Sequence, residues 1–463
     1  MEYLLLLVPM PPLAGFLLLA LDPARVARRW VVATALAAGI APAVILIPLS
    51  IACLSGLCGE GGTIAPIFTL VVGEAEVALA MGLDPLGAVA GITVAVVAAC
   101  VLVYSVDYMA DVDTPDLRRF FALMNLFMAA MLAVVLAADS VSLFLGWELM
   151  GLCSFFLIAY YVTAPSAFAA GRKAFVITRV ADAALLAGLL LLFLEAGTIR
   201  LDTLIPTGAA TDAPFRALTA ALLLVGALGK SAQLPFQTWL PTAMAGPTPV
   251  SALLHSATMV AAGAFLLARF SPILQNTPTV AALAAVAGVA TAAFGAVCAL
   301  AQTDVKRLLA YSSISQIGLM VLAVGVGARE LAMAHFVVHA AFKSLLFLSA
   351  GVMAHAAHGD TSIDALVGAR ERNPLAFWTF AIGAASLAGL PVVTAGWFSK
   401  EAVLSAAFSD GVFGILLWLV AVGAAVLTGA YAFRPVFAAA RTRDIEDPGY
   451  VPHHDVGDET FEP

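Results

Sequence analysis

Long apolar runs recur from one end of this 463-residue chain to the other, and they constrain its fold more than any other feature. Many are about 20 residues long, the length of helix that crosses a hydrocarbon core about 30 Å thick. Hydrophobic residues make up 62% of the chain and charged residues only 11%, whereas soluble globular proteins carry about 25% charged residues. The sequence therefore predicts an all-α polytopic membrane protein without a soluble domain between its spans.

Charges, Gly/Pro clusters and polar loops divide the chain into about thirteen predicted transmembrane helices. One stretch between them, from Phe68 to Gly82, alternates apolar and polar residues around Gly73, which predicts a small extracytoplasmic hairpin instead of a span. The predicted spans lie near residues 3–21, 30–54, 83–106, 119–137, 140–163, 174–197, 217–240, 249–270, 278–301, 308–326, 330–356, 374–400 and 411–434.

The basic residues predict the orientation, because cytoplasmic loops carry the excess of Lys and Arg. With the N-terminus outside, 15 of the 22 basic residues fall on the cytoplasmic side and three are lysines inside the membrane. The four on the opposite side are Arg200, Arg216, Arg269 and Arg329. We therefore expect a multi-pass membrane protein with an extracytoplasmic N-terminus and a cytoplasmic C-terminus.

Two predicted spans carry a proline near the middle, Pro235 and Pro391, and each proline is expected to break its helix. Taken singly, either could be a tolerated kink. Together they occupy corresponding places in two five-helix units, residues 119–270 and 271–434. Because five is odd, consecutive units have opposite orientations, which predicts an inverted repeat of the kind common in transporters.

The segments outside these two units have different predicted characters. Residues 1–118 are expected to hold the N-terminal helices and the hairpin. Residues 435–463 are polar, acidic and contain proline, so we expect a flexible tail.

Three of the five lysines, Lys230, Lys343 and Lys400, lie in stretches built mainly from Ala, Leu, Phe, Gly and Ser. A charge near the bilayer centre costs about 2.5–3.5 kcal/mol on insertion scales, and ionisable groups kept there usually face the protein interior or a water path. The three lysines therefore predict proton or ion movement.

Glu148 is a buried carboxylate candidate, since it lies nine residues after Asp139 in an apolar run, or about 13 Å along a helix. We predict Lys230 as its partner. Burial favours an uncharged lysine and a nearby carboxylate favours a charged one, so moving the carboxylate would switch Lys230 between holding and releasing a proton. Asp182 lies one turn from Arg179, and a local ion pair and a role in conduction are both open for it.

His335, His339 and Lys343 follow one another at spacings of four residues, which places them on one face of a helix. Histidine titrates near neutral pH, so this stripe is expected to pass protons with the help of bridging water. The alternative is a metal ion shared by the two histidines. The charge of Lys343 and the lack of a nearby cysteine or carboxylate disfavour that alternative.

Two further residues complete the predicted set. His255 lies between Lys230 and the histidine stripe in chain order and is expected to bridge the two units. Lys400 follows the second predicted break, and we predict a conduction role for it. Its neighbours Ser399 and Glu401 also fit a lysine that snorkels at a helix end.

The sequence predicts no metal site, no redox cofactor and no nucleic-acid surface in this chain. Its five cysteines form no CxxC pair, and most lie in or beside apolar runs where cysteine behaves as a small hydrophobe. The chain also lacks a nucleotide loop and a flavin fingerprint.

Several long motifs between about Phe68 and Arg434 resemble the proton-pumping antiporter-like subunits of respiratory complex I, and most of all the L subunit, which is chain 5 in mitochondria. The resemblance implies that Glu148, Lys230, His255, Lys343 and Lys400 form a buried charged axis, with the first two as an ion pair. It also implies that protons move along this axis, coupled to quinone reduction in other subunits. The motifs are LGWELMGLCSF, KAFVITRVAD, LGKSAQLPFQTWLPTAMAGPTPVSALLHSATMV, AQTDVKRLLAYSSISQIGLM, HAAFKSLLFLSAG and LPVVTAGWFSKEAVL.

The implied function is that of a proton-translocating subunit of an NADH:quinone oxidoreductase, with other membrane subunits as partners. One motif, WLPTAMAGPTPVSALLHSATMV, is nearly as similar to the large subunits of Mrp-type sodium/proton antiporters, so Na⁺ stays open as a second cargo. A membrane subunit of an inorganic-carbon uptake complex is another alternative. A structural scaffold without transport is a third, which the retained Glu148 and lysines disfavour.

Overall fold

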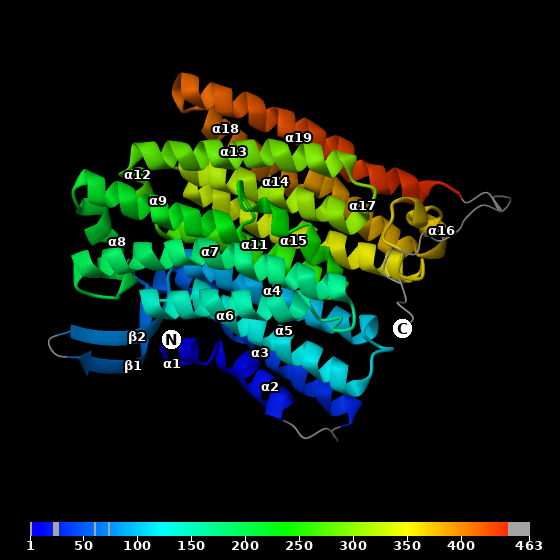
Figure 1. Cartoon of the computed structure of the whole chain (residues 1–463), viewed down its shortest axis with the longest axis horizontal. Helices are drawn as coiled ribbons and strands as arrows, with labels where there is room; N and C mark the ends of the chain where they lie inside the picture. The colour runs from blue at the N-terminus through cyan, green and yellow to red at the C-terminus, as the bar shows by residue number, and fades with distance from the viewer. Residues whose placement is uncertain (1, 22–26, 60–61, 73–74, 443–463) are drawn as a thin grey trace, which may run out of the picture.

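The computed structural model describes residues 2–21, 27–59, 62–72 and 75–442. Long helices lie side by side along one direction, and a β-hairpin projects at one end of the bundle (Figure 1). Among the described residues, 12 helical stretches are long and apolar enough to cross a membrane. This confirms the predicted all-helical, polytopic architecture.

The elements follow the predicted spans closely. The long helices are α2 (Met10–Leu21), α3 (Arg28–Ala52), α4 (Pro85–Tyr108), α5 (Thr114–Val135), α6 (Ser140–Ile158), α7 (Pro165–Ala196), α9 (Ala213–Lys230), α11 (Met259–Arg269), α13 (Pro278–Ala301), α14 (Val305–Gly325), α15 (Arg329–His355), α17 (Pro374–Ala388), α18 (Ala395–Phe408) and α19 (Gly411–Ala440). The shorter elements are α1 (Glu2–Leu6), η1 (Cys53–Leu57), β1 (Thr63–Val72), β2 (Ala75–Leu83), α8 (Leu201–Ala210), η2 (Gln237–Trp239), η3 (Thr242–Ala245), α10 (Thr248–Ser256), α12 (Ser271–Gln275), η4 (Asp364–Leu366) and α16 (Ala369–Arg372).

Capping residues explain where several helices begin. The side chains of Asp84, Asp139 and Asp304 each accept a hydrogen bond from a backbone N–H three residues later, at 2.7–2.8 Å. These bonds satisfy N–H groups that have no partner inside the helix. Proline in the first turn starts α4, α7, α13 and α17, where a missing N–H costs nothing.

A hairpin lies where one was predicted, with β1 and β2 paired antiparallel, and it begins five residues before the predicted start at Phe68. Its extracytoplasmic location stays a prediction. Its tip at residues 73–74, which includes the predicted turn at Gly73, lies outside the described residues. Strand β2 is tied to the start of α6. The N–H of Gly82 donates to the Leu136 carbonyl at 2.7 Å, and the N–H of Ala80 donates to the Asp139 carboxylate at 2.8 Å. The hairpin is therefore anchored to the helix bundle by backbone and side-chain hydrogen bonds.

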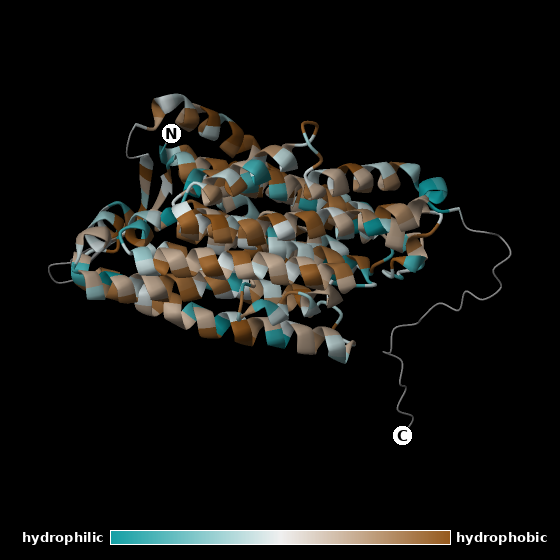
Figure 2. Cartoon of the chain, turned by 90° about the horizontal axis from the view of Figure 1, so that it is seen from above, coloured by the Kyte–Doolittle hydropathy of each residue, from teal (hydrophilic) through white to brown (hydrophobic). Residues whose placement is uncertain are grey.

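Burial separates a protein core from an exposed apolar surface. Helices α10, α11 and α14 are buried almost throughout, whereas α3, α7 and α19 expose large apolar side chains over much of their length. Hydrophobic residues dominate the lengths of the helices (Figure 2). The buried central helices carry or contact most of the predicted site residues.

Helices α13 and α14 pack along a seam where their backbones touch. A Cβ atom added at Gly288 would lie 2.6 Å from the Gly318 carbonyl oxygen, and one added at Gly318 would lie 2.7 Å from the Ala292 nitrogen. Such distances leave no room for a side chain, so the seam depends on small residues, as in many membrane helix pairs.

The chain leaves helical geometry near both predicted prolines. Helix α9 ends at Lys230, and the chain then passes Pro235 and the short turns η2 and η3 before α10 begins. Helix α17 ends at Ala388, Gly389 has a left-handed φ of 75°, and α18 begins after Pro391. The two five-helix units, their inverted relation and the presence of one broken membrane helix in each unit stay predictions.

The predicted span 249–270 corresponds to one candidate membrane span, Thr248–Arg269. It is interrupted between α10 and α11 at Ala257 and Thr258, although no proline or glycine marks that point. Two predicted unit boundaries fall inside helices. The boundary at 118/119 falls inside α5, because the polar first turn of that helix was taken for a loop. Helix α19 continues past the boundary at 434/435 to Ala440, because Pro435 does not end it. Of the predicted tail, residues 443–463 lie outside the described residues.

Candidate functional site

Lys230 at the end of α9 forms a buried ion pair with Asp182 of α7. The Lys230 Nζ donates to the Asp182 carboxylate at 2.9 Å, and the two side chains are 0% and 1% exposed. Trp147 Nε1 donates to the other carboxylate oxygen at 2.6 Å, and its ring centroid lies 5.5 Å from the Lys230 Nζ. Three helices, α6, α7 and α9, thus bring one cation, one anion and one polar aromatic ring together.

Gly151 on α6 makes this approach possible. A Cβ atom at Gly151 would lie 2.7 Å from the Lys230 Nζ, so an alanine there would force the ammonium group away from its position. Two buried charges lose the solvation of water, and close contact with additional hydrogen bonds compensates only when the geometry is good. Trp147 and Gly151 supply that geometry.

The predicted Glu148–Lys230 pair is wrong in this structure. Glu148 instead forms an ion pair with Arg179 of α7, and Asp182 takes the place beside Lys230. The reason lies in the rotation of α6, since successive side chains point about 100° apart. The face with Trp147 is turned towards Asp182, so Glu148 is turned away from it. Of the two alternatives left open for Asp182, the local ion pair with Arg179 is not formed, because Arg179 pairs with Glu148 and Asp182 pairs with Lys230.

The histidine stripe of α15 lies wholly inside the protein. The His335 Nδ1 lies 2.9 Å from the Ser399 hydroxyl of α18, and the His335 and His339 ring centroids are 6.4 Å apart. Lys343 donates to the Leu309 carbonyl at 3.0 Å and to the Ser312 hydroxyl. These contacts place the stripe against α14 and α18.

His255 lies on α10, against α15. Its ring centroid is 4.9 Å from that of Phe347, and Lys343 is close enough to act on it electrostatically. Neither ring nitrogen of His255 has a hydrogen-bond partner among the described residues, and the same holds for His339. Buried imidazole nitrogens normally have a partner, so this region is suited to ordered water.

Lys400 is buried in α18, with 4% of its surface exposed. Its ammonium group donates to the carbonyl of Leu387 in the last turn of α17, where the carbonyl groups lack helical partners and attract a cation. A snorkelling lysine would extend its charge into water, so that interpretation does not fit the burial of Lys400.

Sequence reasoning missed two contributors. Lys306, assigned to a cytoplasmic loop, lies in the first turn of α14 and donates to the Met244 and Gly246 carbonyls at 2.8 and 2.9 Å. Trp147 was not recognised as a donor to Asp182. The sequence around these two residues gives no clear signal. A basic residue soon after Asp304 is typical of an ordinary helix start, and a tryptophan in an apolar run is typical of a hydrophobic core.

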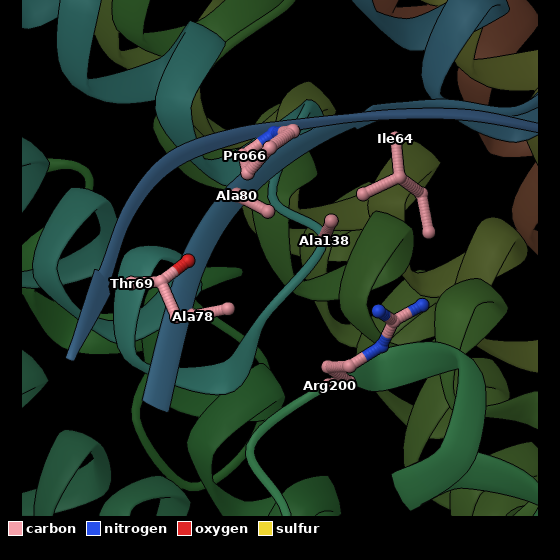
Figure 3. Close-up of a pocket in the computed structure, with 7 residues that line it drawn as sticks. All are labelled: Ile64, Pro66, Thr69, Ala78, Ala80, Ala138 and Arg200. Atoms are coloured by element: carbon pink, nitrogen blue, oxygen red, sulfur yellow. The ribbon is translucent and has the colours of Figure 1, made fainter. Parts of the chain in front are cut away.

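The described residues contain no group of three His, Cys, Asp or Glu side chains arranged to hold a metal ion. Two pockets, of about 320 and 840 Å³, lie at the hairpin end of the bundle. The smaller lies between the hairpin strands and the start of α8, with Arg200 as its one charged lining residue (Figure 3). Neither of these two pockets is lined by a predicted site residue. The candidate site is therefore the set of buried polar side chains described above, namely Asp182, Lys230, His255, His335, His339, Lys343 and Lys400, which is called the buried axis below.

Two family profiles match the chain. The profile of the NADH:quinone oxidoreductase/Mrp antiporter transmembrane region matches residues 137–428, and that of the chain 5 N-terminus of complex I matches residues 70–121. The chain is 41% identical to NADH-quinone oxidoreductase subunit L of Escherichia coli over 430 residues, which cover 92% of this chain and 69% of the relative. The chain spans between about half and about two thirds of the length of the curated relatives it matches.

Solved structures show the same likeness. The Mrp complex from Dietzia matches with a TM-score of 0.81 and 35% identity, over 93% of this chain and 47% of the matched chain. The membrane-bound sulfane sulfur reductase, an archaeal respiratory membrane complex, matches with a TM-score of 0.80 and 22% identity, over 96% and 90%. The second match shows the fold alone. The profiles and the 41% identity to subunit L show that this multi-pass membrane chain belongs to the NADH:quinone oxidoreductase/Mrp antiporter family of membrane subunits, which includes subunit L, or chain 5.

Proposed function

We propose that this chain is a proton-translocating membrane subunit of an NADH:quinone oxidoreductase or a related complex. Protons move along the buried axis of Lys230, His255, the α15 stripe and Lys400, and other subunits supply quinone reduction. This chain contributes no redox chemistry of its own. Its partners are the other membrane subunits of that assembly and the lipid bilayer.

The observation that carries this proposal is the Lys230–Asp182 pair. Both side chains are buried, yet the pair lies at the end of α9, where the chain leaves helical geometry. A structural ion pair inside a membrane protein is costly, and such groups usually belong to ion pathways. The pair holds the proton on Lys230 while it is closed, and separation of Asp182 from Lys230 favours release of that proton.

The proposed location is a bacterial inner membrane, with the N-terminus outside and the C-terminus in the cytoplasm. The excess of basic residues on one side supports this orientation. A protease applied separately to right-side-out and inside-out vesicles tests it, because the segment after Ala440, which contains Arg441 and Arg443, should be cleaved only in inside-out vesicles.

The test of function uses the assembly that co-purifies with the tagged chain, reconstituted into vesicles with a pH-sensitive dye. Lys230→Ala should abolish proton uptake driven by NADH and a short-chain quinone. Lys173→Ala is the matched control and should have little effect. Lys173 directly precedes the predicted span 174–197; in the structure it lies in α7, where it is half-buried. Proton uptake at the wild-type rate in Lys230→Ala would refute the proposed mechanism.

A second candidate function is a subunit of an Mrp-type cation/proton antiporter, which the likeness to the Dietzia Mrp complex favours. The same vesicles distinguish the two functions. A sodium gradient without NADH should drive proton movement only in an antiporter. NADH with quinone should drive it only in an oxidoreductase assembly.

A further inference from the structure

A row of polar side chains runs along one face of α10 from its first turn to His255. Thr248, Ser251 and His255 are spaced three and four residues apart, so they lie on the same side of the helix. The row is about 10 Å long at 1.5 Å per residue. All three side chains are buried, with 3%, 0% and 0% of their surface exposed. An apolar surround of this kind rarely contains three aligned polar groups without a use for them.

The outer end of this row reaches the surface of the protein through Tyr108, the last residue of α4. The Tyr108 hydroxyl donates to the Thr248 hydroxyl at 3.1 Å. Tyr108 is partly exposed, and its ring lies 6.2 Å from that of His355, which is exposed at the end of α15. This is the face of the bundle that the basic residues predict to be cytoplasmic.

The inner end of the row has unused hydrogen-bonding capacity. The Ser251 hydroxyl and both nitrogens of His255 have no partner among the described residues. Leaving a buried polar group unsatisfied costs about 1–3 kcal/mol, so such groups are normally paired with protein or with water. A hydrated row satisfies them and joins Tyr108 to His255 by hydrogen bonds.

We propose that Tyr108, Thr248 and Ser251 form the route by which protons pass between the predicted cytoplasmic face and His255. This inference rests on the proposed function. A hydroxyl group both donates and accepts, so each group in the row takes up one proton as it releases another, and bridging water completes the steps. No group along the route changes its charge after a complete transfer, and no redox step is involved.

A structural role for the same residues predicts something different. The Tyr108–Thr248 hydrogen bond could serve only to join the ends of α4 and α10. That role gives Ser251 no function, because its hydroxyl holds no other group in place. Ser251 is therefore the residue that separates the two interpretations.

The first experiment measures proton uptake in the reconstituted assembly with Thr248→Val and Ser251→Ala combined. Both changes keep the size of the side chain close to the original and remove its hydroxyl. We expect the initial rate of uptake to fall at least tenfold. The matched control combines Thr93→Val and Ser105→Ala in α4, two buried hydroxyls that donate only to carbonyls of their own helix. The control should stay within twofold of the wild-type rate.

The Lys230→Ala variant, measured in the same preparation, separates failure of this route from failure of the proposed function. If Lys230→Ala pumps at the wild-type rate, the proposed function fails. If Lys230→Ala abolishes pumping while the Thr248→Val/Ser251→Ala variant pumps at the wild-type rate, the function stands and the route is overturned.

A second experiment needs no activity. Ser251→Cys, in a background with Cys100 and Cys298 replaced by alanine, is treated with a small water-soluble thiol reagent in inside-out vesicles. A hydrated route predicts modification of this cysteine, with Ser105→Cys protected in the same background. Absence of modification at residue 251 would overturn the proposal, even if the combined variant also failed to pump.

Discussion

In the structure Lys230 pairs with Asp182 and not with Glu148, the partner predicted from the sequence. Measurements of stability can distinguish these two pairings. Two unit charges 2.9 Å apart attract each other by about 6 kcal/mol at an effective dielectric constant near 20. Removing one partner of a buried pair leaves the other charge uncompensated and typically costs about 3–5 kcal/mol. Asp182→Asn and Lys230→Met should each lower the free energy of unfolding by about that amount.

The double variant Asp182→Asn/Lys230→Met should be more stable than either single variant, because it leaves no uncompensated charge. The matching cycle with Glu148→Gln should show a much smaller coupling with Lys230→Met, since Glu148 pairs with Arg179. Unfolding by a denaturing detergent in mixed micelles measures all of these free energies. Equal or larger coupling between Glu148 and Lys230 would refute the pairing described here.

Two further predictions concern other parts of the molecule. Gly151→Ala should displace the Lys230 ammonium group and lower the free energy of unfolding by about 1–3 kcal/mol in the same unfolding assay. Gly423→Ala in α19 is the control, and it should be neutral or slightly stabilising because the space around that Cα is open. The hydrogen bond from Arg200 lowers the pKa of Asp202 in α8. A lowered carboxyl pKa stabilises the fold at neutral pH, and this stabilisation is lost as the pH falls through the folded-state pKa. Arg200→Gln should therefore reduce the acid-induced drop in the thermal midpoint below about pH 4; an unchanged drop would contradict this role.

The lengths of the apolar runs and the positions of single charged residues within them can be read from the sequence. They were sufficient to predict most of the membrane-spanning helices. A run of about 20 apolar residues has few alternatives to a membrane helix, so the spans were predicted well. Lys230, Lys343 and Lys400 stood out because each lies in a stretch built mainly from apolar and small residues. The α10–α11 interruption at Thr258 had no proline or glycine to announce it.

Partner choice depended on how each helix is rotated about its axis, and the sequence did not contain that information in readable form. Trp147 and Glu148 are adjacent, yet only one of them faces Asp182. Lys306 was counted among the cytoplasmic basic residues, because it precedes the predicted span 308–326. Its burial depends on the chain between η3 and α10 folding over it, which is a tertiary event.

The glycine seam between α13 and α14 limits how this molecule can move. Rotation or sliding of either helix would bring a neighbouring side chain into the backbone of the other helix, because the two helix backbones are already in contact at Gly288 and Gly318. We therefore expect α13 and α14 to move together as one rigid body. A conformational change that couples Lys230 to Lys343 is therefore expected to leave the α13–α14 pair fixed. It would use side-chain rotation and the non-helical segments after Lys230 and Ala388.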